Sequence, residues 1–156
     1  MTLVITLHFD TIIFDAAHYI PGYKGKCGNI HGHSYIVKDL RIGVDNQLDR
    51  MGISIDFSSI KQYFDKEWDH KFIVSSPPDD PYPDSWMDIY RLLDMDTAQL
   101  RVVEYTTCEH IAQVIVKELF DRFPQVRFVG FTLYEGAGES TGGVQVCISR
   151  GGDIVA

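Results

Sequence analysis

The chain has 156 residues, a formal net charge of −8 and an apolar share of 45%. This length suits a single domain, spanning residues 1–156, with one hydrophobic core. Its basic residues form no cluster, which argues against a nucleic-acid partner and gives no support for binding to an anionic membrane surface. Its apolar runs are shorter than the roughly 18 residues that a membrane helix needs.

The N-terminus and the cysteines indicate the cellular compartment of the protein. Met1–Ile5 carry neither a basic leader nor a small-residue cleavage site, and they read as the start of a strand. The three cysteines, Cys27, Cys108 and Cys147, form an odd set without the spacing of a disulfide framework. We therefore expect a cytoplasmic protein whose cysteines are thiols.

Two stretches near the N-terminus have the pattern of β-strands. Apolar and polar residues alternate from Leu3 to Phe9, and an apolar run continues the strand towards His18. A glycine-rich loop follows. The residues from His33 to Val44 then form a second predicted strand, and Asp45–Gly52 form a polar turn.

Two helices are predicted further along the chain. The first carries apolar residues at helical spacing between Ile60 and Trp68, and either Asp56 or Ser58 is placed to cap it. The second begins at Thr106–Glu109, a Thr-x-x-Glu sequence that matches the capping box.

The remaining segments complete an α+β pattern. Ser75–Ser85 is rich in proline and aspartate and reads as an exposed loop, and Met87–Leu93 reads as a short helical turn. Val126–Tyr134 and Val144–Ser149 are predicted strands joined through glycines. The order β-β-α-α-β-β predicts an antiparallel sheet covered by helices on one face.

The strongest local signal is the sequence Cys27-Gly28-Asn29-Ile30-His31-Gly32-His33. Histidines two apart on an extended chain point to the same face, so both imidazoles can meet one ion. His18 becomes a third candidate ligand if the two predicted strands pair as a hairpin. Three nitrogen ligands and an open position make a catalytic zinc site, whereas Cys27 as a fourth ligand would make a closed structural one. The spacing leaves both possibilities open.

Several motifs together resemble the 6-pyruvoyl-tetrahydropterin synthase superfamily. They occur in the family's order along nearly the whole chain: Phe14-x-Ala16-Ala17-His18, Cys27-x-x-x-His31-Gly32-His33, Ile55-Asp56-Phe57, Asp69-His70, Thr106-Thr107-Cys108-Glu109 and Leu133-Tyr134-Glu135. The short gap between Cys27 and His31 resembles the 6-carboxy-tetrahydropterin synthase branch, because the 6-pyruvoyl enzymes usually have a longer one. A departure is His110, which stands where the family's Pro-Thr-x-Glu-Asn motif has asparagine.

The resemblance implies a tunnelling fold, with a four-stranded antiparallel sheet and two helices on one face, assembled as a homohexamer with active sites between subunits. It implies a lyase that converts 7,8-dihydroneopterin triphosphate into 6-carboxy-5,6,7,8-tetrahydropterin, acetaldehyde and triphosphate in queuosine biosynthesis. A 6-pyruvoyl-type triphosphate lyase is the alternative with the same fold. A non-catalytic zinc-binding domain and a pterin-binding module without turnover are further alternatives.

The resemblance also assigns roles to residues. His18, His31 and His33 would hold Zn²⁺, which would bind the hydroxyls of the substrate's arm and acidify the neighbouring C–H. Cys27 would be the base that removes the proton, and the pair Asp69–His70 its acid–base partner.

The resemblance assigns substrate recognition mainly to Glu135, an acidic residue near the C-terminus. Glu135 would accept two hydrogen bonds from the amino group and ring N–H of the pterin, and it would take part in the proton relay. Thr106, Thr107 and Glu109 are further candidate contacts to the substrate, although each also has an explanation in helix capping.

Overall fold

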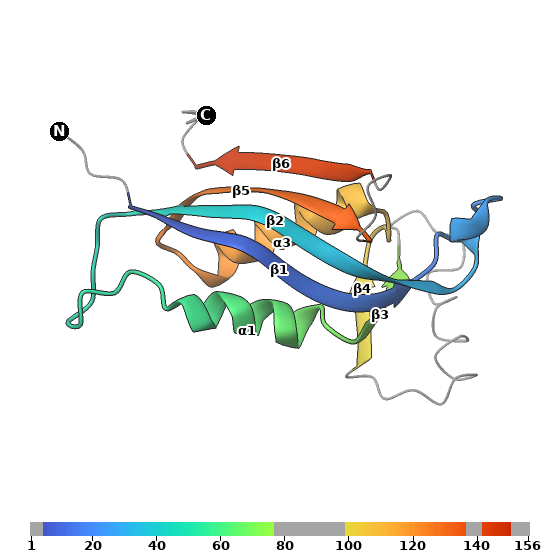
Figure 1. Ribbon diagram of the computed structural model, residues 1–156, viewed down its shortest axis with the longest axis horizontal. Helices are drawn as coiled ribbons and strands as arrows, with labels where there is room; N and C mark the ends of the chain where they lie inside the picture. Colours follow the sequence, from blue (N-terminus) through green and yellow to red (C-terminus); the bar gives the residue numbers. More distant parts are fainter. Residues whose placement is uncertain (1–4, 77–98, 137–141, 151–156) are drawn as a thin grey trace.

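The computed structural model describes residues 5–76, 99–136 and 142–150. The elements in chain order (Figure 1) are the strand β1 (Ile5–His18), a 3₁₀ turn η1 (Lys26–Gly28), β2 (His31–Val44), helix α1 (Phe57–Glu67), β3 (Lys71–Ser75), β4 (Leu100–Val103), helix α3 (Cys108–Arg122), β5 (Val126–Glu135) and β6 (Gly143–Ser149). The predicted loop beyond Ser76 and the helical turn predicted at Met87–Leu93 lie outside the described residues.

The strands form one mixed sheet of six, in the order β4-β3-β1-β2-β5-β6. The strands β1, β2, β5 and β6 pair antiparallel, as the sequence predicted. The prediction of a purely antiparallel four-stranded sheet is wrong, however, because β3 pairs parallel with both β1 and β4. These added strands have five and four residues. They carry no recognisable alternation, and their pairing depends on contacts between distant parts of the chain.

Both helices cover the same face of the sheet (Figure 1), as predicted. Side chains from the sheet and from both helices belong to one buried cluster, which includes Val37 of β2, Phe64 of α1, Ile115 of α3 and Leu133 of β5. Each such side chain stabilises the fold by about 1.5–3 kcal/mol when it is fully buried. Within the described ranges, no helix is long and apolar enough to cross a membrane.

The two long central strands change their buried face partway along their length. In β1 the buried residues are Leu7 and Phe9 before the change, and Phe14 and Ala16 after it. The change lies where Asp39 of β2 adopts a left-handed φ of 55°. As a result His18 faces the helices. Uninterrupted alternation from Leu7 would have placed it on the opposite face.

The helix caps refine the predicted starts. Asp56 caps α1, because its side chain accepts a hydrogen bond from the backbone N–H of Ser58 at 2.7 Å. Thr107 caps α3 through the N–H of His110. The capping box predicted at Thr106–Glu109 is therefore one residue out of register. The physical reason is that the hydroxyl of Thr106 donates to the Tyr19 carbonyl at 2.5 Å instead.

Candidate active site

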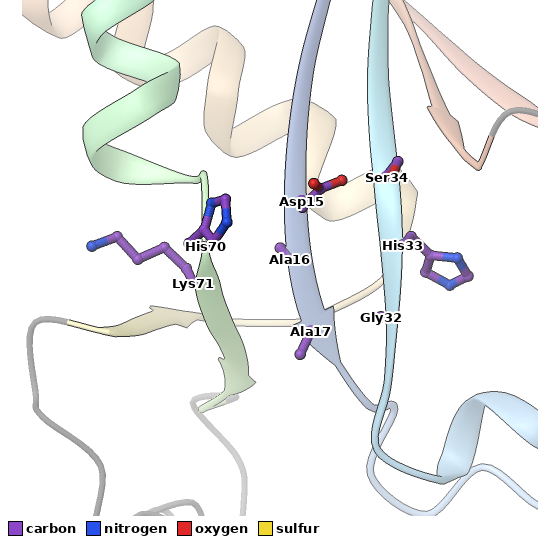
Figure 2. Close-up of a pocket in the computed structure, with 8 residues that line it drawn as sticks. All are labelled: Asp15, Ala16, Ala17, Gly32, His33, Ser34, His70 and Lys71. Carbon is purple, nitrogen blue, oxygen red and sulfur yellow. The ribbon is translucent and has the colours of Figure 1, made fainter.

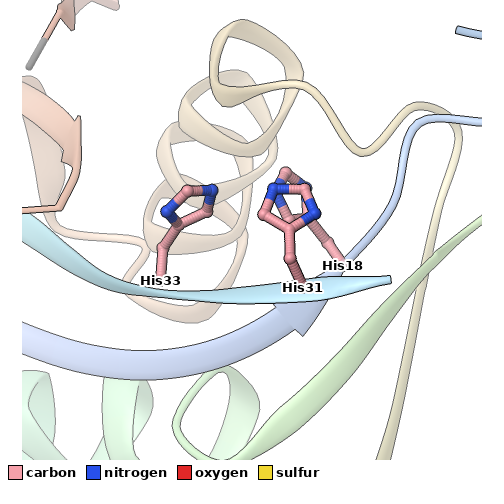
Figure 3. A group of neighbouring side chains, drawn as sticks. All are labelled: His18, His31 and His33. Carbon is pink, nitrogen blue, oxygen red and sulfur yellow. The ribbon is translucent and has the colours of Figure 1, made fainter. Parts of the chain in front are cut away.

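Three histidines converge at the end of the β1–β2 hairpin, on the face that the helices cover. His18 lies opposite His31 in the strand register, and His33 lies opposite Ala16. The ring centroids are 4.5 Å apart for His18 and His31, 4.7 Å for His31 and His33, and 5.1 Å for His18 and His33. One nitrogen from each ring lies within 4.8 Å of the others, and Figure 3 shows the three rings gathered beside the strands. The predicted hairpin and the juxtaposition of the three histidines are thus confirmed.

Backbone carbonyls determine which nitrogen of two of the rings is available. His18 Nδ1 lies 2.9 Å from the carbonyl oxygen of Thr106, and His31 Nδ1 lies 2.7 Å from that of Asn29. A carbonyl oxygen only accepts hydrogen bonds, so Nδ1 carries the proton in both rings. When uncharged, each of these imidazoles therefore has its lone pair on Nε2, the arrangement that metal-binding histidines use.

The electrostatic surroundings favour neutral imidazoles. Burial, together with the neighbouring His31 and His33, lowers the pKa of His18 to about 4 despite the opposing hydrogen bond to Thr106. Burial also lowers the pKa of His33, as does the nearby ring of His31. Neutral histidine is the form that binds a metal ion.

The cluster has unsatisfied nitrogen atoms where a metal ion would bind. Within the described part of the chain, the buried Nε2 atoms of His18 and His33 have no hydrogen-bond partner. A buried polar atom without a partner is costly, and a bound cation would satisfy both. Zn²⁺ suits three imidazole nitrogens, so these residues fit such an ion. Among the described residues the cluster consists of histidines alone and does not include Cys27.

A cavity of about 510 Å³ adjoins the histidine cluster at His33 and brings together half of the predicted site residues. His33 lines it together with Cys27, Thr107, Glu109 and Glu135. These residues come from β2, η1, the start of α3 and the end of β5, which are far apart in the sequence. The cavity therefore places a thiol and two carboxylates beside one of the imidazoles.

The loop that carries Cys27 is held in place by backbone contacts. The N–H of Ile20 donates to the carbonyl of Cys27 at 2.7 Å. The next residue must be glycine, because a Cβ atom at Gly28 would lie 2.0 Å from the carbonyl oxygen of Tyr23. This close approach explains the glycine that follows the cysteine and fixes the thiol at the wall of the cavity.

Glu135 stands opposite Tyr35 in the register of β2 and β5, and the Tyr35 hydroxyl donates to Glu135 Oε1 at 3.4 Å. Burial raises the pKa of Glu135 and the charge of Glu109 raises it further, whereas the bond from Tyr35 opposes both. Sequence reasoning missed Tyr35. It follows His33 at a spacing of two residues, which signals that both side chains share a face.

The predicted substrate residues Thr106 and Thr107 have different surroundings. Thr107 lines the cavity while capping α3. Thr106 is buried, and it uses its hydroxyl on Tyr19 and its carbonyl on His18. Its contact with His18 gives Thr106 a supporting part in the histidine cluster that the sequence did not indicate.

The structure does not bring Asp69 and His70 to this cavity. His70 lies in a second hollow, which Asp15, Lys71 and residues 32–34 of β2 also line (Figure 2), so His33 borders both this hollow and the cavity. Its Nδ1 lies 2.7 Å from Asp69 Oδ2, and its side chain is 79% exposed. The hydrogen bond and charge of Asp69 raise the pKa of His70. Burial alone would raise the pKa of Asp69, but bonds from Asp15 and His70 outweigh it and lower that pKa.

Comparison with known proteins identifies the family. Residues 9–142 match the family described as 6-pyruvoyl tetrahydropterin synthase. The chain belongs to this family. The matched range includes the three histidines, Cys27, His70 and Glu135.

Curated relatives of this family member carry a more specific name. A Haemophilus influenzae protein named 6-carboxy-5,6,7,8-tetrahydropterin synthase is 33% identical over 115 residues, which cover 68% of this chain and 76% of the relative. A Rickettsia typhi protein of the same name is 40% identical over 67 residues, which cover 40% of this chain and 47% of the relative. The chain thus spans about half the length of the Rickettsia relative.

A solved structure shares the fold. The crystal structure of an uncharacterized protein from Wolinella succinogenes aligns with a TM-score of 0.57 and 19% identity, covering 92% of this chain and 99% of that one. The likeness shows the fold alone.

This family member departs from the family pattern at His110. The backbone N–H of His110 donates to the Thr107 hydroxyl at 3.3 Å, and its ring meets that of Tyr105 edge-on at 5.4 Å. The imidazole therefore packs against an exposed tyrosine at the start of α3.

Proposed function

We propose that this chain is a zinc-dependent lyase that converts 7,8-dihydroneopterin triphosphate into 6-carboxy-5,6,7,8-tetrahydropterin, releasing acetaldehyde and triphosphate, as a step of queuosine biosynthesis. The observation that carries the proposal is the cluster of three imidazoles, one of which, His33, lines a cavity together with Cys27 and Glu135. The names of the curated relatives support the choice of product.

The histidine cluster supplies the electrophilic part of the site. His18, His31 and His33 would hold Zn²⁺, which polarises a hydroxyl or carbonyl oxygen of a substrate when bound. The hydrogen bonds from His18 to Thr106 and from His31 to Asn29 keep both rings oriented. Mutation of such orienting partners costs metal sites about 10- to 100-fold in affinity or activity.

Cys27 and Glu135 would act on the substrate from the other walls of the cavity. Cys27 is suited to remove a proton from the carbon arm, because a thiolate is a base and no metal role is assigned to this thiol. Glu135, with Glu109 beside it, would accept hydrogen bonds from the amino group and ring N–H of the pterin. Thr107 would contact the same substrate at the start of α3.

Asp69 and His70 would complete the reaction as the acid–base pair of a neighbouring subunit. Within one chain His70 lines a different hollow from Cys27, although proton transfer needs both groups within hydrogen-bond reach of one substrate. We therefore propose a homohexamer whose sites lie between subunits. Each site would combine the cavity of one subunit with the Asp69–His70 pair of another.

Two alternatives make different predictions for the product and for the metal site. A 6-pyruvoyl-type lyase would release triphosphate but keep the carbon arm. A closed structural zinc domain would need Cys27 as a fourth ligand, whereas the ligand group within the described residues is made of histidines alone. That observation favours a site with an open position.

The test is to incubate the zinc-loaded protein with 7,8-dihydroneopterin triphosphate and to identify the products by mass spectrometry. We expect 6-carboxy-5,6,7,8-tetrahydropterin with acetaldehyde. A pyruvoyl product would assign the chain to the alternative branch. Unchanged substrate, with stoichiometric zinc bound and a folded protein, would contradict the enzymatic proposal.

A further inference from the structure

The backbone of His70 has an unusual conformation. Its φ angle is 56°, in the left-handed region that residues other than glycine rarely adopt. Such a conformation persists only when the surrounding structure over-determines it. On the β1 side, the N–H of His70 donates to the Asp15 carbonyl at 2.7 Å, and the N–H of Asp15 donates to Asp69 Oδ1 at 2.8 Å. Trp68, which precedes the pair, provides the anchor on the helix side.

Trp68 belongs to a closed ring of side-chain contacts. Its indole is fully buried, and Nε1–H donates to the hydroxyl of Tyr63 at 2.9 Å. That hydroxyl donates to Glu118 Oε2 at 2.8 Å. The other oxygen of Glu118 accepts a hydrogen bond from Arg101. The Cζ atom of Arg101 lies 4.5 Å from the centroid of the Trp68 indole. We name these four residues the Trp68 ring. It ties α1, α3 and β4 together around the residue before Asp69.

The charges inside the Trp68 ring keep its hydrogen bonds in one arrangement. Arg101 lies between Glu118 and Glu67, whose Oε2 is 3.4 Å from Nη1. Burial, followed by the charge of Glu118, raises the pKa of Tyr63 well above its ordinary value. The phenol therefore stays protonated and donates to Glu118. Removing one member would leave buried polar groups without partners, so the Trp68 ring should act as a unit.

We propose that the Trp68 ring is a positioning device that holds the end of α1 so that Asp69 and His70 keep the geometry needed for proton transfer. The inference rests on the proposed function, since that function gives His70 its acid–base role. Tyr63, Glu118 and Arg101 would act through Trp68 and would not touch the substrate. A displacement of about 1 Å in a reacting group can lower a rate by roughly 100-fold.

The test is Tyr63→Phe, which keeps the aromatic ring and removes the hydroxyl that joins Trp68 to Glu118. We expect kcat to fall roughly 10- to 100-fold at an unchanged KM and zinc content, because the cavity and the histidines are intact. We also expect the amide of His70 to exchange its hydrogen roughly tenfold faster, since its bond to Asp15 loosens. Glu118→Gln breaks the charge pair with Arg101 and provides a second variant should Tyr63→Phe not fold.

The control is Phe120→Leu, which weakens the core on α3 outside the Trp68 ring. The proposal would be overturned if the amide of His70 exchanged at the wild-type rate in both Tyr63→Phe and Glu118→Gln. It would also be overturned if that amide exchanged equally fast in a Phe120→Leu protein with the same melting temperature as these variants. If the wild type turned over no pterin, the proposed function would fail. Exchange at His70 would then still decide whether the Trp68 ring positions that residue.

Discussion

At the residue scale, the histidine cluster depends on which nitrogen each ring presents. The carbonyl oxygens of Thr106 and Asn29 accept hydrogen bonds from the Nδ1 atoms of His18 and His31, and Nε2 of each ring is left for a metal ion. This arrangement makes the metal-binding role of each ring testable separately.

Replacing His18, His31 or His33 by alanine should sharply lower the zinc content, because two remaining imidazoles bind a zinc ion far more weakly than three. The measurement is metal content by mass spectrometry after dialysis, with one zinc per chain expected for the wild type. His8→Ala is the matched control, since His8 lies on β1 but contacts Asp39 at 3.1 Å. A triple-alanine protein that retained stoichiometric zinc would rule out this site.

Glu135→Gln should weaken pterin binding, because its amide nitrogen would face donors of the pterin with another donor. An unmatched buried donor costs about 1–3 kcal/mol, which corresponds to at least a several-fold loss of affinity. Fluorescence titration at matched zinc occupancy measures this loss. Asp121→Asn, on the exposed side of α3, controls for the change in net charge. Equal affinities would show that another residue holds the pterin edge, with Glu109 the next candidate.

Asp69→Asn should lower the pKa of His70 towards its ordinary value, because the hydrogen bond and the charge of Asp69 raise it. The raised pKa means that the pair stabilises the fold below about pH 6.5. This contribution is lost as the pH rises through the raised value. NMR titration of the imidazole gives the pKa directly. Asp65→Asn, which removes a weaker charge effect, should shift it less. An unchanged value in Asp69→Asn would contradict the pairing.

At the element scale, the start of α3 combines several functions in three residues. Thr106 holds His18 and Tyr19, Thr107 caps the helix, and Glu109 faces the cavity. The register of the helix determines which residue caps it and which residue faces the cavity. A shift by one residue towards the C-terminus would put Cys108 at the cap and remove the hydroxyl from it.

Thr107→Ala should lower the free energy of unfolding by about 1 kcal/mol, the usual cost of losing a side-chain cap. The expected loss follows from the hydrogen bond that the Thr107 hydroxyl accepts from the N–H of His110 at 3.3 Å. Urea denaturation measures the difference. Thr107→Ser keeps the hydroxyl and should restore most of the stability. A Thr107→Ala protein as stable as the wild type would show that the cap contributes nothing.

At the scale of the whole molecule, the positions of Cys27 and His70 bear on assembly. Cys27 lines the cavity and His70 lines a separate hollow of the same chain. If each site is shared between two subunits, each chain supplies the thiol to one site and the imidazole to another.

Mixing a Cys27→Ala protein with a His70→Ala protein, after dissociation and reassembly, should therefore restore part of the activity that each lacks alone. Mixed oligomers would contain some sites in which both groups are intact. Cys27→Ala alone should keep its zinc and fold. Light scattering gives the mass of the assembly, which should be that of a hexamer. Absence of restored activity in mixed hexamers would contradict the shared site.

Local sequence patterns predicted the two helices, the long strands and the histidines that gather at the candidate site. Helical spacing and capping residues specify α1 and α3 locally, and His31-Gly32-His33 places two imidazoles on one face wherever the strand lies. These features rest on neighbours in the chain, so a sequence pattern is enough to predict them.

The tertiary structure alone decided the parallel strands β3 and β4, the face of His18 and the separation of His70 from the cavity. The two short strands gain their hydrogen bonds from partners far along the chain. His18 faces the helices because β1 and β2 change their buried face partway along, and strict alternation does not predict that change. The position of His70 depends on Asp15, 55 residues earlier in the sequence. Each is set by packing between distant segments, and local propensity carries no information about such packing.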